Sequence, residues 1–302
     1  MRKGLNIILL LLISCSIFVA QRKKPKFEYI AGIGTTSFLG DLGGANAVGT
    51  HFIKDLDFAS TRPLLVAGVR IKRHPIFGFK SMLSIGMLRG DDKWTKDPFR
   101  NNRNLNFRAP IVELSAQAEF YFVRERIPKL YSFKSVGKKK KNIAAYAFLG
   151  VGGLLFVPQG NYNGKWYSLR KMSTEGQGLA NGAKAYSPVT IVIPYGLGFK
   201  YGLTRKFSVG AELGLRFSFS DYIDDVSGTY YDKNALAAAK GQTAAALADP
   251  SLGDIYGATS PATDGTPAQR GDVKNKDSYA FIQFSVDYKV YKSKKRRTRS
   301  KF

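Results

Sequence analysis

The sequence predicts an all-β protein: an eight-stranded antiparallel up-and-down β-barrel of the outer-membrane type, with long extracellular loops and a basic periplasmic rim. Three observations support this prediction. Eight segments alternate apolar and polar residues with a period of two, the connections between them alternate in length, and the chain begins with an export signal. An even number of antiparallel strands can close into a barrel without leaving an exposed edge.

The amino-terminal segment predicts export. Arg2 and Lys3 precede an uncharged apolar run from Leu5 to Ala20, which is the pattern of a secretory signal peptide. We expect a signal peptide over residues 1–20, a barrel over 21–291 and a basic tail over 292–302. Residues 12–15 also resemble a lipoprotein signal, so acylation of Cys15 stays open as an alternative. No later stretch reaches the roughly 20 apolar residues of a membrane-spanning helix.

The strand pattern is clearest between Phe207 and Phe219, where every odd residue is apolar and the even residues include Glu212 and Arg216. Successive side chains of a strand point to opposite faces. A soluble sandwich would bury the apolar face, whereas a membrane barrel turns it to lipid; the breadth of the apolar face favours the barrel. The expected strands are 26–36, 62–73, 76–88, 106–123, 143–157, 189–201, 206–220 and 278–291.

The connections predict the orientation. Residues 37–61, 89–105, 158–188 and 221–277 are long, residues 74–75 and 202–205 form tight turns, and residues 124–142 are intermediate. Bacterial barrels combine short periplasmic turns with long extracellular loops, so we expect the turns and both termini on the periplasmic side. Within 221–277 the alanine-rich segment Ala235–Ala248 predicts a short helix, and the remainder is expected to be mobile or packed on the surface.

Charged residues on the polar face of the strands predict a filled interior. Eight side chains form the expected charge network: Glu28, Arg70, Lys80, Glu113, Glu119, Glu212, Arg216 and Asp287. An eight-stranded barrel is just wide enough for side chains to fill it. Opposite charges at this spacing would pair, so we expect no open channel.

The formal net charge is +25, and most of it is expected at the periplasmic end. About 26 cations are expected there, Arg70 and Lys200 among them, against Glu28, Glu125 and Asp287, which is enough to set the electrostatic field of that face. The interpretation is a docking surface for an acidic periplasmic partner, with anionic lipid or cell-wall polymer as alternatives. The rim residues expected to bind are Arg124, Arg126, Lys129, Lys134, Lys138, Lys139, Lys140, Lys141, Arg205, Lys206, Lys292, Lys294, Lys295, Arg296, Arg297 and Arg299.

No constellation of residues predicts an enzyme or a cofactor. Histidine occurs only at His51 and His74, too few to build a catalytic pair with confidence. The carboxylates of Asp221, Asp224, Asp225 and Asp232 could hold calcium, but they lack the spacing of an EF-hand loop. The tripeptide at residues 270–272 has the Arg-Gly-Asp sequence of adhesion motifs, although three common loop residues often meet by chance. We therefore expect no catalytic residue, no metal and no small-molecule substrate.

Eight stretches are distinctive in their order and spacing: residues 27–29, 38–44, 61–63, 90–92, 103–108, 113–120, 194–200 and 220–231. Together they resemble the PorG family over almost all of the mature chain. The resemblance implies an outer-membrane barrel of the type IX protein secretion system, which supports gliding motility in some members. It further implies that the barrel ties a periplasmic ring of PorK and PorN to the outer membrane. The basic tail departs from ordinary barrels, which end in the aromatic residue of their last strand.

Two other functions remain in view from the sequence. The strongest rival is a small transport or porin-like protein, and the second is a surface adhesin acting through residues 221–277. Sizeable open-state currents in planar bilayers would favour the first. Loss of cell attachment with normal secretion after deletion of residues 221–277 would favour the second.

Overall fold

A computed structural model describes residues 26–40, 42, 60–72, 74–95, 97–124, 142–253, 268–273 and 275–291. The expected signal peptide, Cys15, His51, the lysine run 138–141 and the tail from 292 lie outside these residues, as do Arg126, Lys129 and Lys134.

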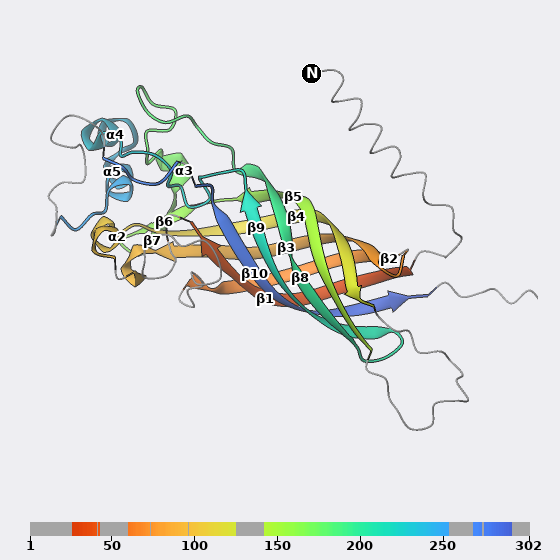
Figure 1. Ribbon diagram of the computed structural model, residues 1–302. Helices are drawn as coiled ribbons and strands as arrows, with labels where there is room; N and C mark the ends of the chain where they lie inside the picture. Colours follow the sequence, from red (N-terminus) through yellow and green to blue (C-terminus); the bar gives the residue numbers. More distant parts are fainter. Residues whose placement is uncertain are drawn as a thin grey trace, which may run out of the picture.

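Eight antiparallel strands close into a barrel (Figure 1). They are β1 (Lys26–Leu39), β2 (Arg62–Lys72), β3 (Phe77–Asp91), β4 (Asn106–Val123), β5 (Ile143–Phe156), β8 (Val189–Gly202), β9 (Phe207–Ser218) and β10 (Ser278–Val290). Each strand pairs with its neighbours in the chain, and β1 pairs with β10 to complete the ring. The predicted eight-stranded antiparallel barrel is confirmed, and each expected strand lies within three residues of an observed one at both ends.

The barrel has a turn end and a loop end. At the turn end lie residues 74–76 and 203–206, together with the starts of β1 and β5 and the ends of β4 and β10. The loop end carries every helix of the described residues: η3 (Asp92–Trp94), α2 (Pro98–Arg103), α3 (Leu169–Met172), α4 (Lys233–Lys240) and α5 (Gln242–Ala248). No helix in the described part of the chain is long and apolar enough to cross a membrane.

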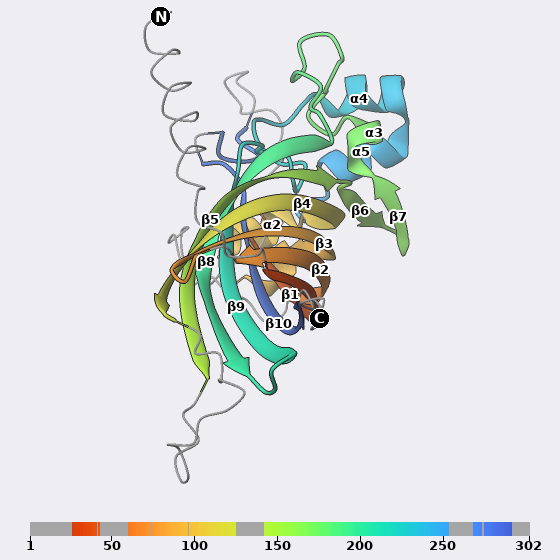
Figure 2. The ribbon, with the colours of Figure 1, turned by 90° about the vertical axis from the view of Figure 1, so that its right-hand side faces the viewer.

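The long connections at the loop end are folded where the structure describes them. Residues 159–168, expected as loop, form a hairpin of β6 (Gln159–Tyr162) and β7 (Lys165–Ser168), and β6 extends the edge of β4. The alanine-rich segment forms two helices instead of one, because Gly241 adopts a φ of +91° between them. Figure 2 shows α3, α4, α5 and the hairpin gathered together at the loop end. We call these elements, with residues 173–187, 219–232 and 268–273, the cap.

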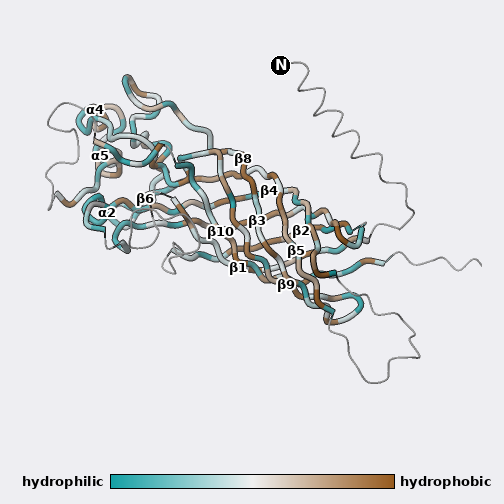
Figure 3. Tube along the Cα trace, viewed as in Figure 1, coloured by the Kyte–Doolittle hydropathy of each residue, from teal (hydrophilic) through white to brown (hydrophobic). Residues whose placement is uncertain are grey.

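The outer face of the barrel is apolar. On β3 the outward residues run from Phe77 through Phe79 and Leu83 to Ile85, all between 41% and 63% exposed. Figure 3 shows the apolar colour along the strands and the hydrophilic colour over the loop end. A closed barrel with an apolar exterior and a polar interior leaves no unpaired backbone group in lipid. This architecture places the protein in the outer membrane.

Candidate functional site

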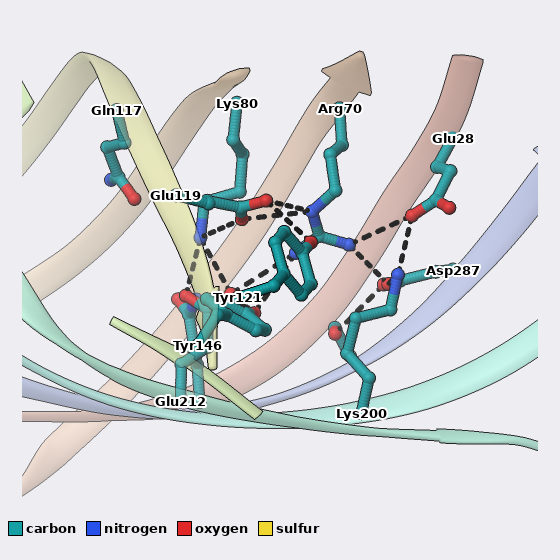
Figure 4. A network of polar contacts seen from close by, with 12 residues as sticks. Glu28, Arg70, Lys80, Gln117, Glu119, Tyr121, Tyr146, Lys200, Glu212 and Asp287 are labelled. Atoms are coloured by element: carbon teal, nitrogen blue, oxygen red, sulfur yellow. Dashed lines mark hydrogen bonds and ion pairs between the residues drawn. The ribbon is translucent and has the colours of Figure 1, made fainter. Parts of the chain in front are cut away.

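The half of the lumen nearest the turn end is filled by ion pairs centred on Arg70 (Figure 4). Its side chain is 1% exposed and its guanidinium contacts four carboxylates: its Nη1 lies 2.6 Å from Asp287 and 3.2 Å from Glu28, its Nε lies 2.9 Å from Glu119, and its Nη2 lies 3.5 Å from Glu212. Because β1 and β2 are in register with Glu28 opposite Arg70, this pair is fixed by strand pairing alone. The planar guanidinium can bridge carboxylates from several strands at once.

Two lysines complete this group, which we call the lumen cluster: Glu28, Arg70, Lys80, Glu119, Lys200, Glu212 and Asp287. Lys80 Nζ lies 2.6 Å from Glu212, and Lys200 Nζ lies 2.9 Å from Asp287. The Tyr146 hydroxyl donates a hydrogen bond to Glu212. A Cβ on Gly198 would come within 2.3 Å of the Tyr146 ring, so this glycine makes room for the ring inside the barrel.

Above the lumen cluster the interior changes from ionic to apolar. Arg216 Nε lies 3.4 Å from Glu113, and the Arg216 guanidinium carbon lies 3.9 Å from the centre of the Phe281 ring. The Tyr279 hydroxyl donates to Glu113 over 2.9 Å. Toward the loop end follows a buried apolar layer that continues into the cap: Phe38, Leu64, Leu88, Phe107, Ile111, Phe156, Val192 and Phe281 with Leu42, Leu105, Leu169, Ile223, Val226 and Leu247. Side chains therefore occupy the lumen from the lumen cluster into the cap.

The structure brings all eight sequence-predicted interior residues into this lumen, buried to 7% exposure or less. Arg70 and Lys200 were also counted among the rim cations, and that assignment is wrong, because both are buried and paired with carboxylates. Sequence reasoning missed Lys200, Tyr121 and Tyr146 as members of the interior network. The signal was available, since Lys200 lies on the inward face of its strand.

A second buried polar group holds the cap together; we call it the cap cluster, formed by Thr174, Glu175, Tyr186, Asp225 and Arg270. Arg270 is 2% exposed. Its Nη1 lies 3.1 Å from Glu175 Oε1 and donates to the backbone carbonyl of Asp225 over 2.6 Å. Adhesion through an Arg-Gly-Asp motif requires an accessible arginine, so this geometry does not support that interpretation of residues 270–272.

The aspartates considered for calcium each have protein partners. The Asp225 carboxylate accepts hydrogen bonds from the hydroxyls of Thr174 and Tyr186, and Asp221 accepts one from Ser227. Asp224 accepts from the backbone N–H groups of Leu42 and Val226, and Asp232 caps the start of α4. Among the described residues no three histidine, cysteine or carboxylate side chains form a group suited to a metal ion. These aspartates instead shape the cap.

Asp225 makes the stability of the cap depend on pH. Burial raises the pKa of its carboxyl to about 6, and the charge of Arg270 and the two hydroxyl donors offset only part of that effect. The ordinary value is 3.8, so the folded cap binds a proton more tightly than the unfolded chain does. The stability that this proton contributes is present below about pH 4 and is lost as the pH rises toward 6, by about 3 kcal/mol at most.

We expect the substitution Asp225→Asn to remove this pH dependence, because an amide has no charge to desolvate. Hydrogen exchange of residues 221–253, corrected for the intrinsic rate at each pH, should show more opening at pH 7 than at pH 4.5 in the native chain. The same comparison should be flat in the variant. Equal pH dependence in the two proteins would assign the effect to another group.

The basic rim is described at three of its predicted residues. Arg124, Arg205 and Lys206 are exposed at the turn end, on the side of the barrel opposite the cap. Arg205 is held by Tyr291, whose hydroxyl donates to the Arg205 carbonyl over 2.8 Å. The other predicted rim residues lie outside the described part of the chain.

Comparisons with known proteins give one family match. The model of the family described as "Domain of unknown function (DUF6089)" matches residues 3–240. No curated protein matches the chain.

Three solved barrels resemble the structure. Ail of Yersinia pestis has 9% identity, covering 89% of this chain and 100% of that chain at a TM-score of 0.36. OprG of Pseudomonas aeruginosa has 11% identity, covering 89% and 98% at 0.38, and Neisserial surface protein A has 7% identity, covering 89% and 100% at 0.35. At these scores the likeness carries no argument, and the barrel assignment rests on the strand pairing.

Proposed function

This chain belongs to the DUF6089 family, whose common domain has no known function, and we propose that it is a docking scaffold of the outer membrane. In this proposal the basic rim at the turn end faces the periplasm and binds an acidic protein partner. The resemblance to the PorG family suggests the partner: the PorK and PorN ring of the type IX secretion system.

The observation that carries the proposal is the filled lumen. Arg70, Lys80 and Lys200 pair with carboxylates inside the barrel, and the apolar layer continues this filling toward the cap. A barrel whose interior is occupied in this way provides no path for solutes, so its surfaces remain to carry the function. Because the lumen cations are paired with carboxylates, they contribute little to the electrostatic field outside the barrel. The cations of the rim are therefore the source of an external positive field.

Neutralising the rim should weaken binding of the ring. We expect replacement of Lys138–Lys141 and of the basic residues of the tail 292–302 by glutamine to reduce co-purification of ring proteins about tenfold near 0.15 M salt, because charge complementarity drives this association. Binding by the native chain should also fall as the salt concentration rises. The measurement is quantitative recovery of PorK and PorN on affinity-tagged full-length protein from membranes.

A matched control for the lysine run removes four charges from the other end of the barrel. Lys171, Lys184, Lys240 and Lys276 are exposed at the loop end, and their replacement by glutamine should leave recovery of the ring unchanged. If recovery is unchanged by the rim substitutions as well, the rim contacts lipid or cell-wall polymer and the scaffold proposal fails.

The transport alternative is separated by conductance in planar bilayers. The paired charges of the lumen cluster predict no sustained open-channel current from the native protein. Sizeable open-state currents would favour a small pore.

The adhesin alternative is weakened because Arg270 of the Arg-Gly-Asp tripeptide is buried in the cap. Deletion of residues 221–277 tests this alternative directly. Loss of cell attachment with normal secretion would favour adhesion.

A further inference from the structure

Two arginines face each other on the outer surface of the barrel near the loop end. Arg89 on β3 and Arg108 on β4 are direct cross-strand partners in the antiparallel register. Both side chains are half-buried. Like charges placed directly opposite one another destabilise a strand pair. A negatively charged group bound between the two arginines would remove this repulsion.

Neither guanidinium forms an ion pair within the described part of the chain. No carboxylate of the described residues forms an ion pair with Arg89 or Arg108, although Asp92 pairs with the nearby Arg100 and Arg103. Arg108 Nε donates to the neutral amide oxygen of Gln159 over 2.9 Å. Asp91 follows on the same face of β3, and its carboxylate accepts the backbone N–H of Lys93. Its charge acts on Arg89 without forming an ion pair and offsets part of that positive charge. The pair of arginines therefore keeps a net positive charge.

Aromatic rings hold the two guanidinium groups in place. The guanidinium carbon of Arg108 lies 4.1 Å from the centre of the Trp166 ring, and that of Arg89 lies 5.2 Å from Trp94 and 6.0 Å from Trp166. Such contacts orient an arginine and leave its N–H groups available to an anion. Trp166 comes from the β6–β7 hairpin and Trp94 from η3, so two loop-end elements converge on this pair.

The height of the pair on the barrel identifies the environment. The outward apolar column of β3 begins with Phe77 at the turn end, and Arg89 is the first charge after Ile85 and Met87 on the same face. The ten residue steps from Phe77 to Met87 rise about 25 Å through the membrane at ~3.4 Å per residue and a tilt of ~40°. This distance matches the apolar band of a membrane barrel, so the arginines lie at the level of the lipid headgroups.

We propose that Arg89 and Arg108, with Trp94 and Trp166, bind a phosphate group of an anionic glycolipid in the leaflet at the loop end. A phosphate placed between the two guanidinium groups would accept a pair of charge-assisted hydrogen bonds from them and remove their repulsion. The lipid's acyl chains would follow the apolar column below. The proposal rests on the membrane placement of the proposed function and on the loop end facing outward, but not on any contact with a periplasmic partner.

The chain provides its own reporter for this site, because Trp94 and Trp166 are the two tryptophans of the whole sequence. The experiment titrates folded full-length protein in a neutral detergent with bisphosphorylated lipid A and follows tryptophan emission. We expect a saturable change with lipid A and none with phosphatidylcholine. The double substitution Arg89→Gln with Arg108→Gln should weaken the apparent affinity about tenfold or more, since it removes charged hydrogen-bond donors.

The controls separate the site from general charge and from free phosphate. Replacing Lys171 and Lys184 by glutamine removes two exposed charges elsewhere in the loop-end region and should leave the titration unchanged. An equal loss of affinity in this control, or no loss in the arginine variant, would overturn the proposal. A saturable response to inorganic phosphate alone, matching that to lipid A, would overturn the assignment to a lipid. Native mass spectrometry of the arginine variant gives a second, independent count of bound lipid. A gel band whose mobility still changes on heating shows that the variant barrel is folded.

Discussion

Replacing Arg70 by methionine should destabilise the barrel more than any other single substitution in the lumen. Arg70 contacts Glu28, Glu119 and Asp287 within 3.2 Å, and its side chain is 1% exposed. The variant would leave these carboxylates without their shared counter-ion in a site that water does not reach. Breaking a buried ion pair by removing one partner costs about 3–5 kcal/mol of unfolding free energy. The measurement is urea unfolding in micelles, with heat-dependent mobility on gels as an independent test of folding.

Two further variants distinguish lost charge balance from lost packing. Arg70→Lys keeps the charge, but one ammonium group cannot reach all the carboxylates in the geometry of a guanidinium, so an intermediate stability is expected. Adding Glu119→Gln to Arg70→Met should recover part of the loss, because it removes one of the carboxylate charges that Arg70 no longer balances. Lys206→Met, on the exposed turn before β9, is a control that should leave unfolding unchanged. If Arg70→Met unfolds like this control, the lumen cluster does not hold the barrel together.

The barrel itself was predictable because period-two alternation is a local property of the sequence. The stretch from Phe207 to Phe219 sets its own two faces, and Glu212 and Arg216 therefore fall on the inward face without any knowledge of the other strands. The strand ends were less certain because turn residues have no alternation. Thus β9 begins at Phe207 and ends at Ser218, one residue after the predicted start and two residues before the predicted end.

The interior pairs were predictable as a set but not as partners. Parity identifies Arg70 and Glu28 as inward, and their pairing follows from the register of adjacent strands. Lys200 pairs with Asp287 across the lumen, between strands that are not neighbours, and only the closed geometry brings them together. The assignment of Lys200 to the rim rested on its position near a strand end, where a long side chain can reach the membrane surface. The alternation of its strand already places Lys200 on the inward face.

The cap could not be predicted, because its contacts join distant parts of the chain that have no periodic pattern. Arg270 and Glu175 are 95 residues apart in the sequence, and the intervening chain includes two strands and two helices of the described structure. Arg89 and Arg108 illustrate the same limit on the outer face. Each is an ordinary loop-end cation in the sequence, and only the register makes them a facing pair.

The second large effect is expected in the cap, where Arg270→Met should release the cap and leave the barrel folded. Arg270 is paired with Glu175, and its Nη1 also donates to the Asp225 carbonyl; its Nε donates to the carbonyl of Ala248 at the end of α5 over 3.3 Å. The substitution would leave the buried Glu175 carboxylate without its ion-pair partner. It would also remove a nearby positive charge that favours the ionised form of Asp225, and a link between three loop-end segments. We expect a loss of about 3–5 kcal/mol confined to the cap.

Limited proteolysis should detect this loss as new cleavage within residues 169–253, while the barrel keeps its heat-dependent mobility on gels. The matched control is Lys276→Met, an exposed cation of the same connection, which should leave the cleavage pattern unchanged. We expect Arg70→Met to affect the barrel and Arg270→Met to affect the cap, because the two arginines have different partners. The residues of the lumen cluster contact one another between barrel strands, whereas Arg270 contacts the cap. Unfolding of the whole barrel in Arg270→Met would mean that the apolar layer beneath the cap, and not the strand pairing with the lumen cluster, limits the stability of the fold.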